Sequence, residues 1–76
     1  MSALPKMQPV SSSMLNEVGY DAANATLYVR FNGGKVYRYF NVSAASYATL
    51  MNAESVGKYF NANVKPNHTF EEVAGA

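Results

Sequence analysis

The turn Asn32-Gly33-Gly34 constrains the fold of this chain more than any other feature, because it separates two runs rich in β-branched and aromatic residues. In the first run, residues 25–32, apolar and polar side chains alternate with the period of two that is typical of a strand. Glycine adopts positive φ without a steric clash. The second run, residues 35–42, is therefore predicted to fold back on the first as an antiparallel β-hairpin.

The position of Arg38 decides the register of this hairpin. A two-residue loop would place Arg38 on the apolar face with no acid nearby, and burying an unpaired charge is costly. A three-residue loop, with Gly34 in the left-handed conformation of a G1 bulge, leaves Arg38 outside and pairs Val29 with Tyr37. The core face is then expected to hold Leu27, Val29, Phe31, Tyr37 and Tyr39. The exposed face is expected to hold Tyr28, Arg30, Val36, Arg38 and Phe40.

Further elements are predicted on both sides of the hairpin. Alternation in residues 13–21 predicts a strand before it. The side chains expected on one side of this strand are Met14, Val18 and Tyr20, with Leu15 on the other. After the hairpin, Ser43 is a good N-cap for a helix, and Ser55 is a good N-cap for a short helical turn. Together these elements predict an α+β domain, in which a three-stranded antiparallel sheet is followed by one helix and a short second helical turn.

The length and composition bound the domain organisation. A chain of 76 residues buries enough surface for one modest core, and 49% hydrophobic against 14% charged residues is typical of a packed domain. Residues 1–10 contain Pro5 and Pro9 without any period, and they are predicted to be a flexible arm. Residues 11–73 are predicted to form the single folded domain, and residues 74–76 a disordered end. The absence of cysteine excludes disulfides.

The charges are nearly balanced, with six Lys and Arg against five Asp and Glu and a net charge of +1. Such a chain has no long-range field to attract nucleic acid or an anionic membrane, and its pI of about 8.0 is below the value of ~9 that nucleic-acid-binding domains commonly exceed. No run approaches the ~18 apolar residues of a membrane span, and the N-terminus lacks the pattern of a signal peptide. We therefore expect a cytoplasmic protein.

Candidate catalytic and metal-binding residues are few. His68 is the one histidine, and without cysteine it has no partners for a plausible zinc site. The acids Asp21, Glu54, Glu71 and Glu72 are scattered, so a catalytic pair of carboxylates is not expected. The sequence predicts no enzymatic activity, no metal and no cofactor.

A set of short motifs extends over most of residues 10–70. Its members are Val18-Gly19-Tyr20-Asp21, Leu27-x-Val29-x-Phe31, the glycine turn, Tyr37-x-Tyr39 and Ala53-x-Ser55-x-Gly57-x-Tyr59-Phe60-Asn61. This set resembles the KTSC domain family, whose small domains occur alone in bacterial and phage proteins and at the C-terminus of some lysyl-tRNA synthetases. Two positions depart from the family pattern, because Ser43 stands where proline is usual, and His68 and Thr69 stand near a usual tyrosine.

Aromatic residues and arginines on the exposed hairpin face are the predicted partner-binding site. Six Tyr and four Phe are more than a core of this size needs, so some of them should be exposed. The predicted site residues are Tyr28, Arg30, Lys35, Arg38 and Phe40, with further contacts from Leu4, Met7 and Val10 of the arm. Tyr and Arg dominate protein–protein hot spots, and aromatic and guanidinium planes on a sheet also bind single-stranded RNA. If the helices packed on this face instead, Tyr37 and Tyr39 would be exposed.

The resemblance implies a binding role, because the family supplies no catalytic residue, and its synthetase context suggests RNA binding. We expect a non-catalytic interaction module that docks on a larger protein assembly of gene expression. The candidate partners are the ribosome, a synthetase and RNA polymerase, and a domain of this kind encoded by a phage would act in the host cytoplasm as a regulator that binds host RNA polymerase. The alternative hypothesis is direct binding of RNA or single-stranded nucleic acid.

Overall fold

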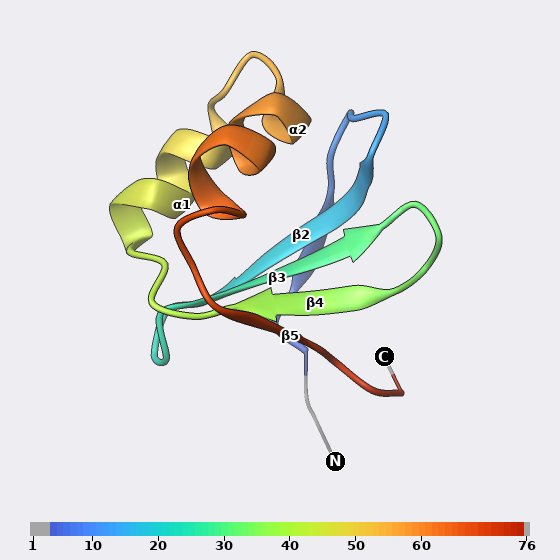
Figure 1. Ribbon diagram of the computed structural model, residues 1–76, viewed down its shortest axis with the longest axis vertical. Helices are drawn as coiled ribbons and strands as arrows, with labels where there is room; N and C mark the ends of the chain where they lie inside the picture. Colours follow the sequence, from blue (N-terminus) through green and yellow to red (C-terminus); the bar gives the residue numbers. More distant parts are fainter. Residues whose placement is uncertain (1–3, 76) are drawn as a thin grey trace.

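The sheet has five antiparallel strands that lie side by side in chain order, and the helices cover one of its faces (Figure 1). The computed structural model describes residues 4–75. In chain order the elements are β1 (Met7–Pro9), β2 (Leu15–Asp21), β3 (Thr26–Phe31), β4 (Val36–Tyr39), α1 (Ala44–Met51), α2 (Val56–Tyr59), the π-helix η1 (Phe60–Val64) and β5 (Phe70–Glu72). The predicted α+β class with an antiparallel sheet and two helical segments is confirmed, but the predicted number of three strands is wrong.

Strands β3 and β4 form the predicted hairpin in the predicted register. Val29 faces Tyr37 across the two strands, so Arg38 lies on the face of the sheet away from the helices. Gly34 has a φ of 97°, and its amide donates a hydrogen bond of 2.8 Å to the carbonyl of Phe31. A residue with a side chain is strained at this φ, which is why the turn requires glycine. We call the face of the sheet that points away from the helices the outer face.

A β-bulge in β2 changes which side chains of this strand enter the core. The pairing of β2 with β3 shifts by one residue between Leu15 and Glu17. The extra residue returns Leu15 to the same side as Val18, and both side chains are completely buried beneath the helices. The expectation that Leu15 points to the opposite side from Val18 was therefore wrong, because strict alternation holds only in an unbroken ladder.

Both predicted N-caps are present. The side-chain oxygen of Ser43 accepts a hydrogen bond of 3.1 Å from the amide of Ser46 at the start of α1. The side-chain oxygen of Ser55 accepts one of 3.3 Å from the amide of Lys58 at the start of α2. Each cap satisfies an amide that has no partner within the helix. The two caps thus fix where each helical segment begins, and η1 continues directly from α2.

The two additional strands lie at the edges of the sheet and contain three residues each. Strand β1 pairs with β2, with Met7 opposite Gly19, and β5 pairs with β4, with Phe70 opposite Tyr39. Three residues are too few to show a period of two in the sequence, and Pro9 lacks the amide that a central strand needs. Strand β1 falls within the predicted arm. Residues 1–3 of that arm and residue 76 of the predicted disordered end lie outside the described residues.

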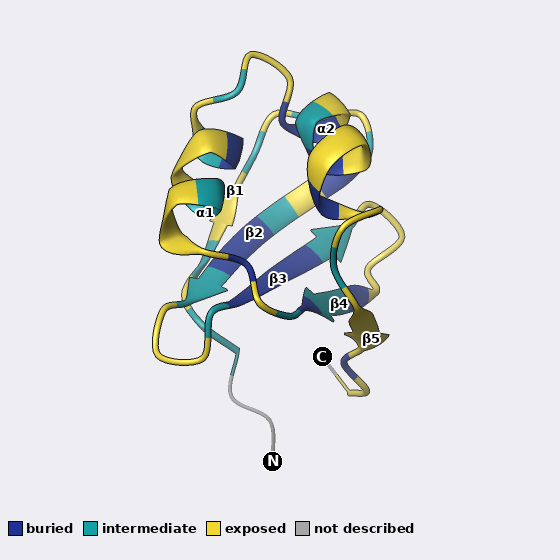
Figure 2. Ribbon diagram, turned by 60° about the vertical axis from the view of Figure 1, so that its left-hand side comes forward, coloured by how far each residue is buried: buried dark blue, intermediate teal, exposed yellow. Residues whose placement is uncertain are grey.

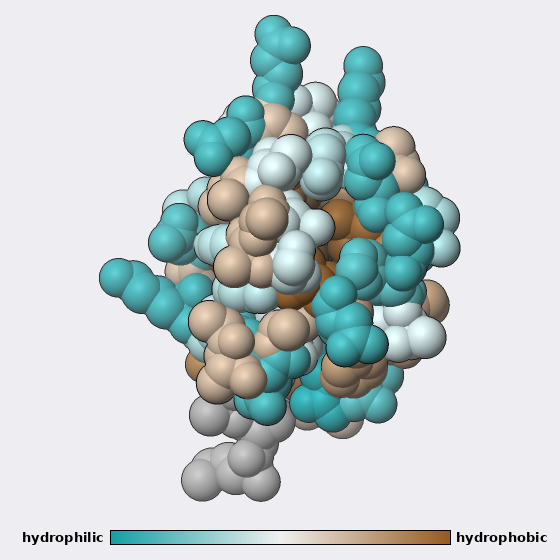
Figure 3. Space-filling model, turned by 90° about the vertical axis from the view of Figure 1, so that its left-hand side faces the viewer, coloured by the Kyte–Doolittle hydropathy of each residue, from teal (hydrophilic) through white to brown (hydrophobic). Residues whose placement is uncertain are grey.

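The main core is formed by residues of the sheet and of the helical segments, and Figure 2 shows buried stretches on β2, on β3 and on the helices. Its buried residues are Leu15, Val18, Leu27, Val29, Tyr39, Val42, Leu50, Val56, Phe60 and Val64. Phe60 is completely buried and packs edge-on against two sheet residues, with ring centroids 5.8 Å from Phe31 and 5.1 Å from Tyr39. These edge-to-face contacts fix η1 above the hairpin. On the side drawn in Figure 3, the most hydrophobic surface lies in a recess between hydrophilic side chains.

A second, smaller apolar cluster lies on the outer face. Tyr28 is 8% exposed, Val36 is 1% exposed and Val73 is 6% exposed. Leu4 and Met7, which precede and begin β1, pack against this cluster. The expectation that Tyr28 and Val36 are exposed was therefore wrong, because the chain before β1 and the chain after β5 both fold over this part of the hairpin.

Candidate functional site

A polar hollow of about 400 Å³ opens on the outer face beside the second apolar cluster. Its lining comes from the end of β2, the following turn, β3 and β4, and consists of Asp21, Asn24, Thr26, Tyr28, Arg38 and Phe40. The side chain of Asp21 accepts hydrogen bonds from the Ala23 amide at 3.1 Å and from the Asn24 side chain at 2.8 Å. These hydrogen bonds order the turn, which lines one side of the hollow.

Arg38 lies at the centre of the groups around this hollow. It stands opposite Tyr28 on β3 and opposite Glu71 on β5, so the ladder itself places the three side chains next to one another. Both Nε and Nη2 of Arg38 donate hydrogen bonds to Oε1 of Glu71. The guanidinium carbon also lies 5.7 Å from the ring centre of Phe40, within the range of a cation–π contact.

The neighbours of Arg38 favour its charged form. The hydrogen bond to the Glu71 carboxylate raises the pKa of Arg38 above its ordinary value, with a smaller contribution from the Tyr28 side chain. The side chain of Arg38 remains 33% exposed, so a part of the guanidinium faces solvent. The structure therefore presents a permanent cation whose orientation is fixed from two sides and whose remaining donors are accessible.

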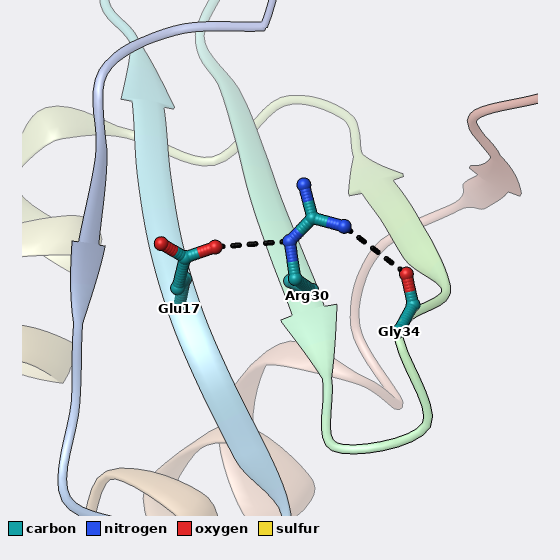
Figure 4. A network of polar contacts seen from close by, with 3 residues as sticks. All are labelled: Glu17, Arg30 and Gly34. Carbon is teal, nitrogen blue, oxygen red and sulfur yellow. Dashed lines mark hydrogen bonds and ion pairs between the residues drawn. The ribbon is translucent and has the colours of Figure 1, made fainter. Parts of the chain in front are cut away.

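The second arginine of the outer face is already engaged within the protein (Figure 4). Nε of Arg30 donates to Oε1 of Glu17 on β2 at 2.9 Å. Nη1 of Arg30 donates to the carbonyl of Gly34 in the hairpin turn at 3.1 Å. Arg30 thus joins β2, β3 and the turn, and its primary contribution is to the geometry of the hairpin.

The predicted site residues separate into two groups. Tyr28, Arg38 and Phe40 line the same hollow, whereas Arg30 and the exposed Lys35 lie together at the hairpin turn. Only the first group forms a concave surface. Of the predicted arm contacts, Leu4 and Met7 cover the second apolar cluster, and Val10 packs against the main core. Contact of these residues with a partner stays a prediction.

A further concave region, on the face of the sheet that the helices cover, was not predicted from the sequence. This aromatic groove has a volume of about 320 Å³ and is lined by Phe31, Tyr37, Tyr39, Lys65 and Phe70. A signal was present in the sequence, because Phe70 precedes a short polar end and could pair with the aromatic strand β4. No residue pattern indicated that η1 lies above that strand.

The described part of the chain offers no metal centre and no membrane-spanning helix. Within residues 4–75, no group of three His, Cys, Asp or Glu side chains lies close enough together to hold a metal ion. No helix in the same range is long and apolar enough to cross a bilayer.

Residues 4–75 form a small α+β domain in which a five-stranded meander carries its helices on one face. The family model described as KTSC domain matches residues 11–68. The chain therefore belongs to the KTSC domain family. A crystal structure of a KTSC domain protein from Yersinia pestis is similar to it, with a TM-score of 0.84 and 32% sequence identity over 90% of this chain and 96% of that one.

Two kinds of relatives share this domain. A protein from Tsukamurella paurometabola is 45% identical over 60 residues, which cover 79% of this chain and 90% of that protein. A lysine–tRNA ligase from Nostoc punctiforme is 33% identical over 72 residues, which cover 95% of this chain but only 13% of the ligase. The same domain thus occurs as nearly a whole protein and as a small part of a large enzyme.

Proposed function

We propose that this KTSC domain is a non-catalytic interaction module that docks on a larger protein assembly of the gene-expression machinery through its outer face. The observation that carries the proposal is the guanidinium of Arg38, which Glu71 and Phe40 hold at the edge of the polar hollow. Docking would use Arg38, Phe40 and the accessible part of Tyr28, with Lys35 and Arg30 at the rim.

Fixing the side chain before binding increases what it contributes to an interface. A mobile arginine loses rotamer freedom when a partner immobilises it, and this loss reduces the affinity. Arg38 is already ordered by its carboxylate partner and by the Phe40 ring. Arg and Tyr are also the residue types enriched among the side chains that carry most of the energy of protein interfaces. A fixed arginine beside a hollow is therefore suited to anchor a partner.

The charges of the outer face favour a protein partner over RNA. Each of its arginines is paired with a carboxylate, Arg30 with Glu17 and Arg38 with Glu71. RNA binding depends on several cations that neutralise phosphates, and paired arginines supply little net positive charge for this purpose. Among the predicted site residues, Lys35 at the turn is the cation for which no ion pair is found within residues 4–75. Direct RNA binding remains the alternative outcome of the test.

The relatives support a place in gene expression. Similar sequences make up most of a small protein and 13% of a lysine–tRNA ligase, so the domain is found in different protein contexts. The ligase context suggests an association with translation, in which a synthetase or the ribosome is the assembly that the domain contacts. RNA polymerase is a third candidate, which fits a small regulator encoded by a phage.

The test is affinity capture from a bacterial lysate, with and without nuclease treatment, with the wild-type domain and the Arg38→Ala variant on separate beads. Lys58→Ala, on α2 at the other face, is the matched control for loss of one cation. We expect the wild type and the control to retain the same protein assembly after nuclease treatment, and Arg38→Ala to lose it. Capture that disappears with nuclease would show that RNA holds the partner. Equal capture by all three proteins would overturn the proposal.

A further inference from the structure

Strand β5 is an edge of the sheet, and β4 is its neighbour on one side (Figure 1). Every residue of β5 is exposed. Just before β5, the carbonyl of Thr69 accepts a hydrogen bond of 2.9 Å from the amide of Phe40. Just after β5, the amide of Val73 donates one of 2.8 Å to the carbonyl of Val36. These two hydrogen bonds fix which backbone groups of β5 face β4.

Two residues of β5 turn their backbone groups away from the sheet. In an antiparallel ladder, pairs of residues that exchange hydrogen bonds alternate with pairs that do not. Because the hydrogen-bonded positions of this ladder include 69 and 73, the amides and carbonyls of Phe70 and Glu72 point outward. No hydrogen bond to these amides and carbonyls is found within residues 4–75. They form a template on which the backbone of a further strand can pair.

The opposite edge of the sheet, strand β1, is less suited to pairing. The amide of Val10 donates a hydrogen bond of 3.1 Å to the carbonyl of Asn16 on the β2 side. By the same alternation, Met7 and Pro9 are the residues of β1 whose backbone faces outward. Proline has no amide hydrogen, so this edge lacks the donor that a regular ladder needs at position 9. A further strand is therefore accommodated better at β5 than at β1.

The side chains beside the outward backbone groups determine which sequence pairs well with this edge. Phe70 is 51% exposed, and Glu72, two positions further along the strand, points to the same face of the sheet. Within residues 4–75 no ion pair is found for Glu72. Opposite charges on directly facing residues of neighbouring strands are stabilising, so Glu72 favours a basic residue across from it. Lys65 lies beside Phe70 in the lining of the aromatic groove, so the position across from Phe70 favours an uncharged, apolar residue.

A second copy of this chain fits the β5 edge poorly. If β5 paired antiparallel with β5 of another copy through Phe70 and Glu72, the Glu71 side chains of the two copies would lie directly opposite each other. Like charges in that position are destabilising. The side chain of Glu71 is 48% exposed, so its contact with Arg38 does not cover it. The edge is therefore complementary to a strand of different sequence, in which basic residues replace the acidic ones.

We propose that the β5 edge binds an extended segment of another protein as an additional antiparallel strand, with a basic residue opposite Glu72 and an aliphatic residue opposite Phe70. The backbone of the segment pairs with the outward amides and carbonyls, and the two side chains, at positions i and i+2, provide the specificity. Phe70 and Glu72 point to the opposite face of the sheet from Arg38. This site is therefore separate from the docking surface proposed above, and each proposal can fail without the other.

The experiment is an NMR titration of the full, isotope-labelled chain with a peptide in which Lys-Thr-Val is flanked by threonines. In antiparallel pairing the lysine lies opposite Glu72 and the valine opposite Phe70, so hydrogen exchange of the amides of Phe70 and Glu72 should slow on binding. N-methylation of the peptide's lysine and valine amides removes two hydrogen bonds and should weaken the affinity about tenfold or more. N-methylation of the threonine between them, whose amide points away from β5, is the matched control.

Two variants of the protein test the charge complementarity. Glu72→Lys places a like charge opposite the peptide's lysine, and we expect an affinity about fivefold weaker. Glu54→Lys makes the same change of charge at an exposed residue outside β5, and we expect it to bind the peptide like the wild type. Glu72 is exposed and without an ion pair in the described chain, so its replacement should leave the fold intact.

The results separate the alternatives. The proposal is supported if the Lys-Thr-Val peptide protects the amides of Phe70 and Glu72, and if both the edge-facing N-methylation and Glu72→Lys weaken its binding. It is overturned if the peptide leaves these amides unprotected, if the two patterns of N-methylation have the same effect, or if Glu72→Lys and Glu54→Lys bind equally. Protection of the same amides at rising protein concentration without peptide would identify a second copy as the occupant, and this result would also overturn the proposal.

Discussion

Replacing Val36 by alanine tests whether the outer face of the sheet is a second core. Val36 is 1% exposed and packs with Tyr28 and Val73. The substitution removes two buried methyl groups at about 0.8 kcal/mol each, and the cavity that remains raises the expected loss to about 2 kcal/mol. A domain of this length has a total stability of about 4–11 kcal/mol. We therefore expect a large fraction of the stability to be lost.

The loss is measured by urea unfolding followed by circular dichroism, and by the melting temperature, which should fall by about 8–16 °C. Val29→Ala is the matched control, because Val29 is completely buried on the other face of the same hairpin. We expect the two variants to lose similar amounts. If Val36→Ala lies within about 0.5 kcal/mol of the wild type while Val29→Ala is destabilised, the outer face behaves as a surface and the reasoning is refuted.

Three further predictions follow from the same contacts. Deleting residues 1–10 removes β1 and the packing of Leu4 and Met7, so the melting temperature should fall. An unchanged melting temperature would show that these residues do not stabilise the fold. Burial raises the pKa of the folded-state Tyr39 hydroxyl, so the unfolded chain loses this proton at a lower pH than the folded chain does. The free energy of unfolding should therefore decline as the pH rises above about 10. The decline should be smaller in Tyr39→Phe. Gly34→Ala places a side chain at a φ of 97°, and nothing lies within 4 Å of the added Cβ. We expect the free energy of unfolding in urea to fall by about 1 kcal/mol or more, and the strained backbone alone would cause this loss.

The hairpin could be predicted because its determinants are local. The glycine turn, the alternation of side chains and the cost of burying Arg38 all favour the register in which Val29 faces Tyr37, and that register is present. The N-caps Ser43 and Ser55 are equally local, since each oxygen bonds an amide three residues further along the chain.

The remaining features depend on contacts between distant residues. The bulge next to Leu15 is set by the pairing of β2 with β3, and no residue in β2 marks it. The pairing of Arg38 with Glu71 joins positions 33 residues apart, and the packing of Leu4 and Met7 against the cluster that contains Tyr28 brings the N-terminal chain onto the hairpin. Sequence periodicity reports which side of a strand is apolar, but it does not report which other segment covers that side.

The same limit applies to the two concave surfaces. Three of the predicted site residues, Tyr28, Arg38 and Phe40, line one hollow because adjacent strands place them together. The aromatic groove was not predicted because Phe70 is placed by the pairing of β5 with β4, and Lys65 follows η1, which packs on the sheet through Phe60. Both depend on tertiary contacts that the alternation of residues does not encode.

The dissociation constant between the domain and its captured protein assembly, measured for the wild type, Arg38→Ala and Lys58→Ala at low and high salt, tests the central claim most directly. We predict that Arg38→Ala binds at least about tenfold more weakly, that Lys58→Ala binds like the wild type, and that the wild-type affinity changes little with salt. Equal affinities for wild type and Arg38→Ala, or a logarithm of affinity that falls steeply with the logarithm of salt as phosphate contacts require, would contradict docking of a protein on the outer face.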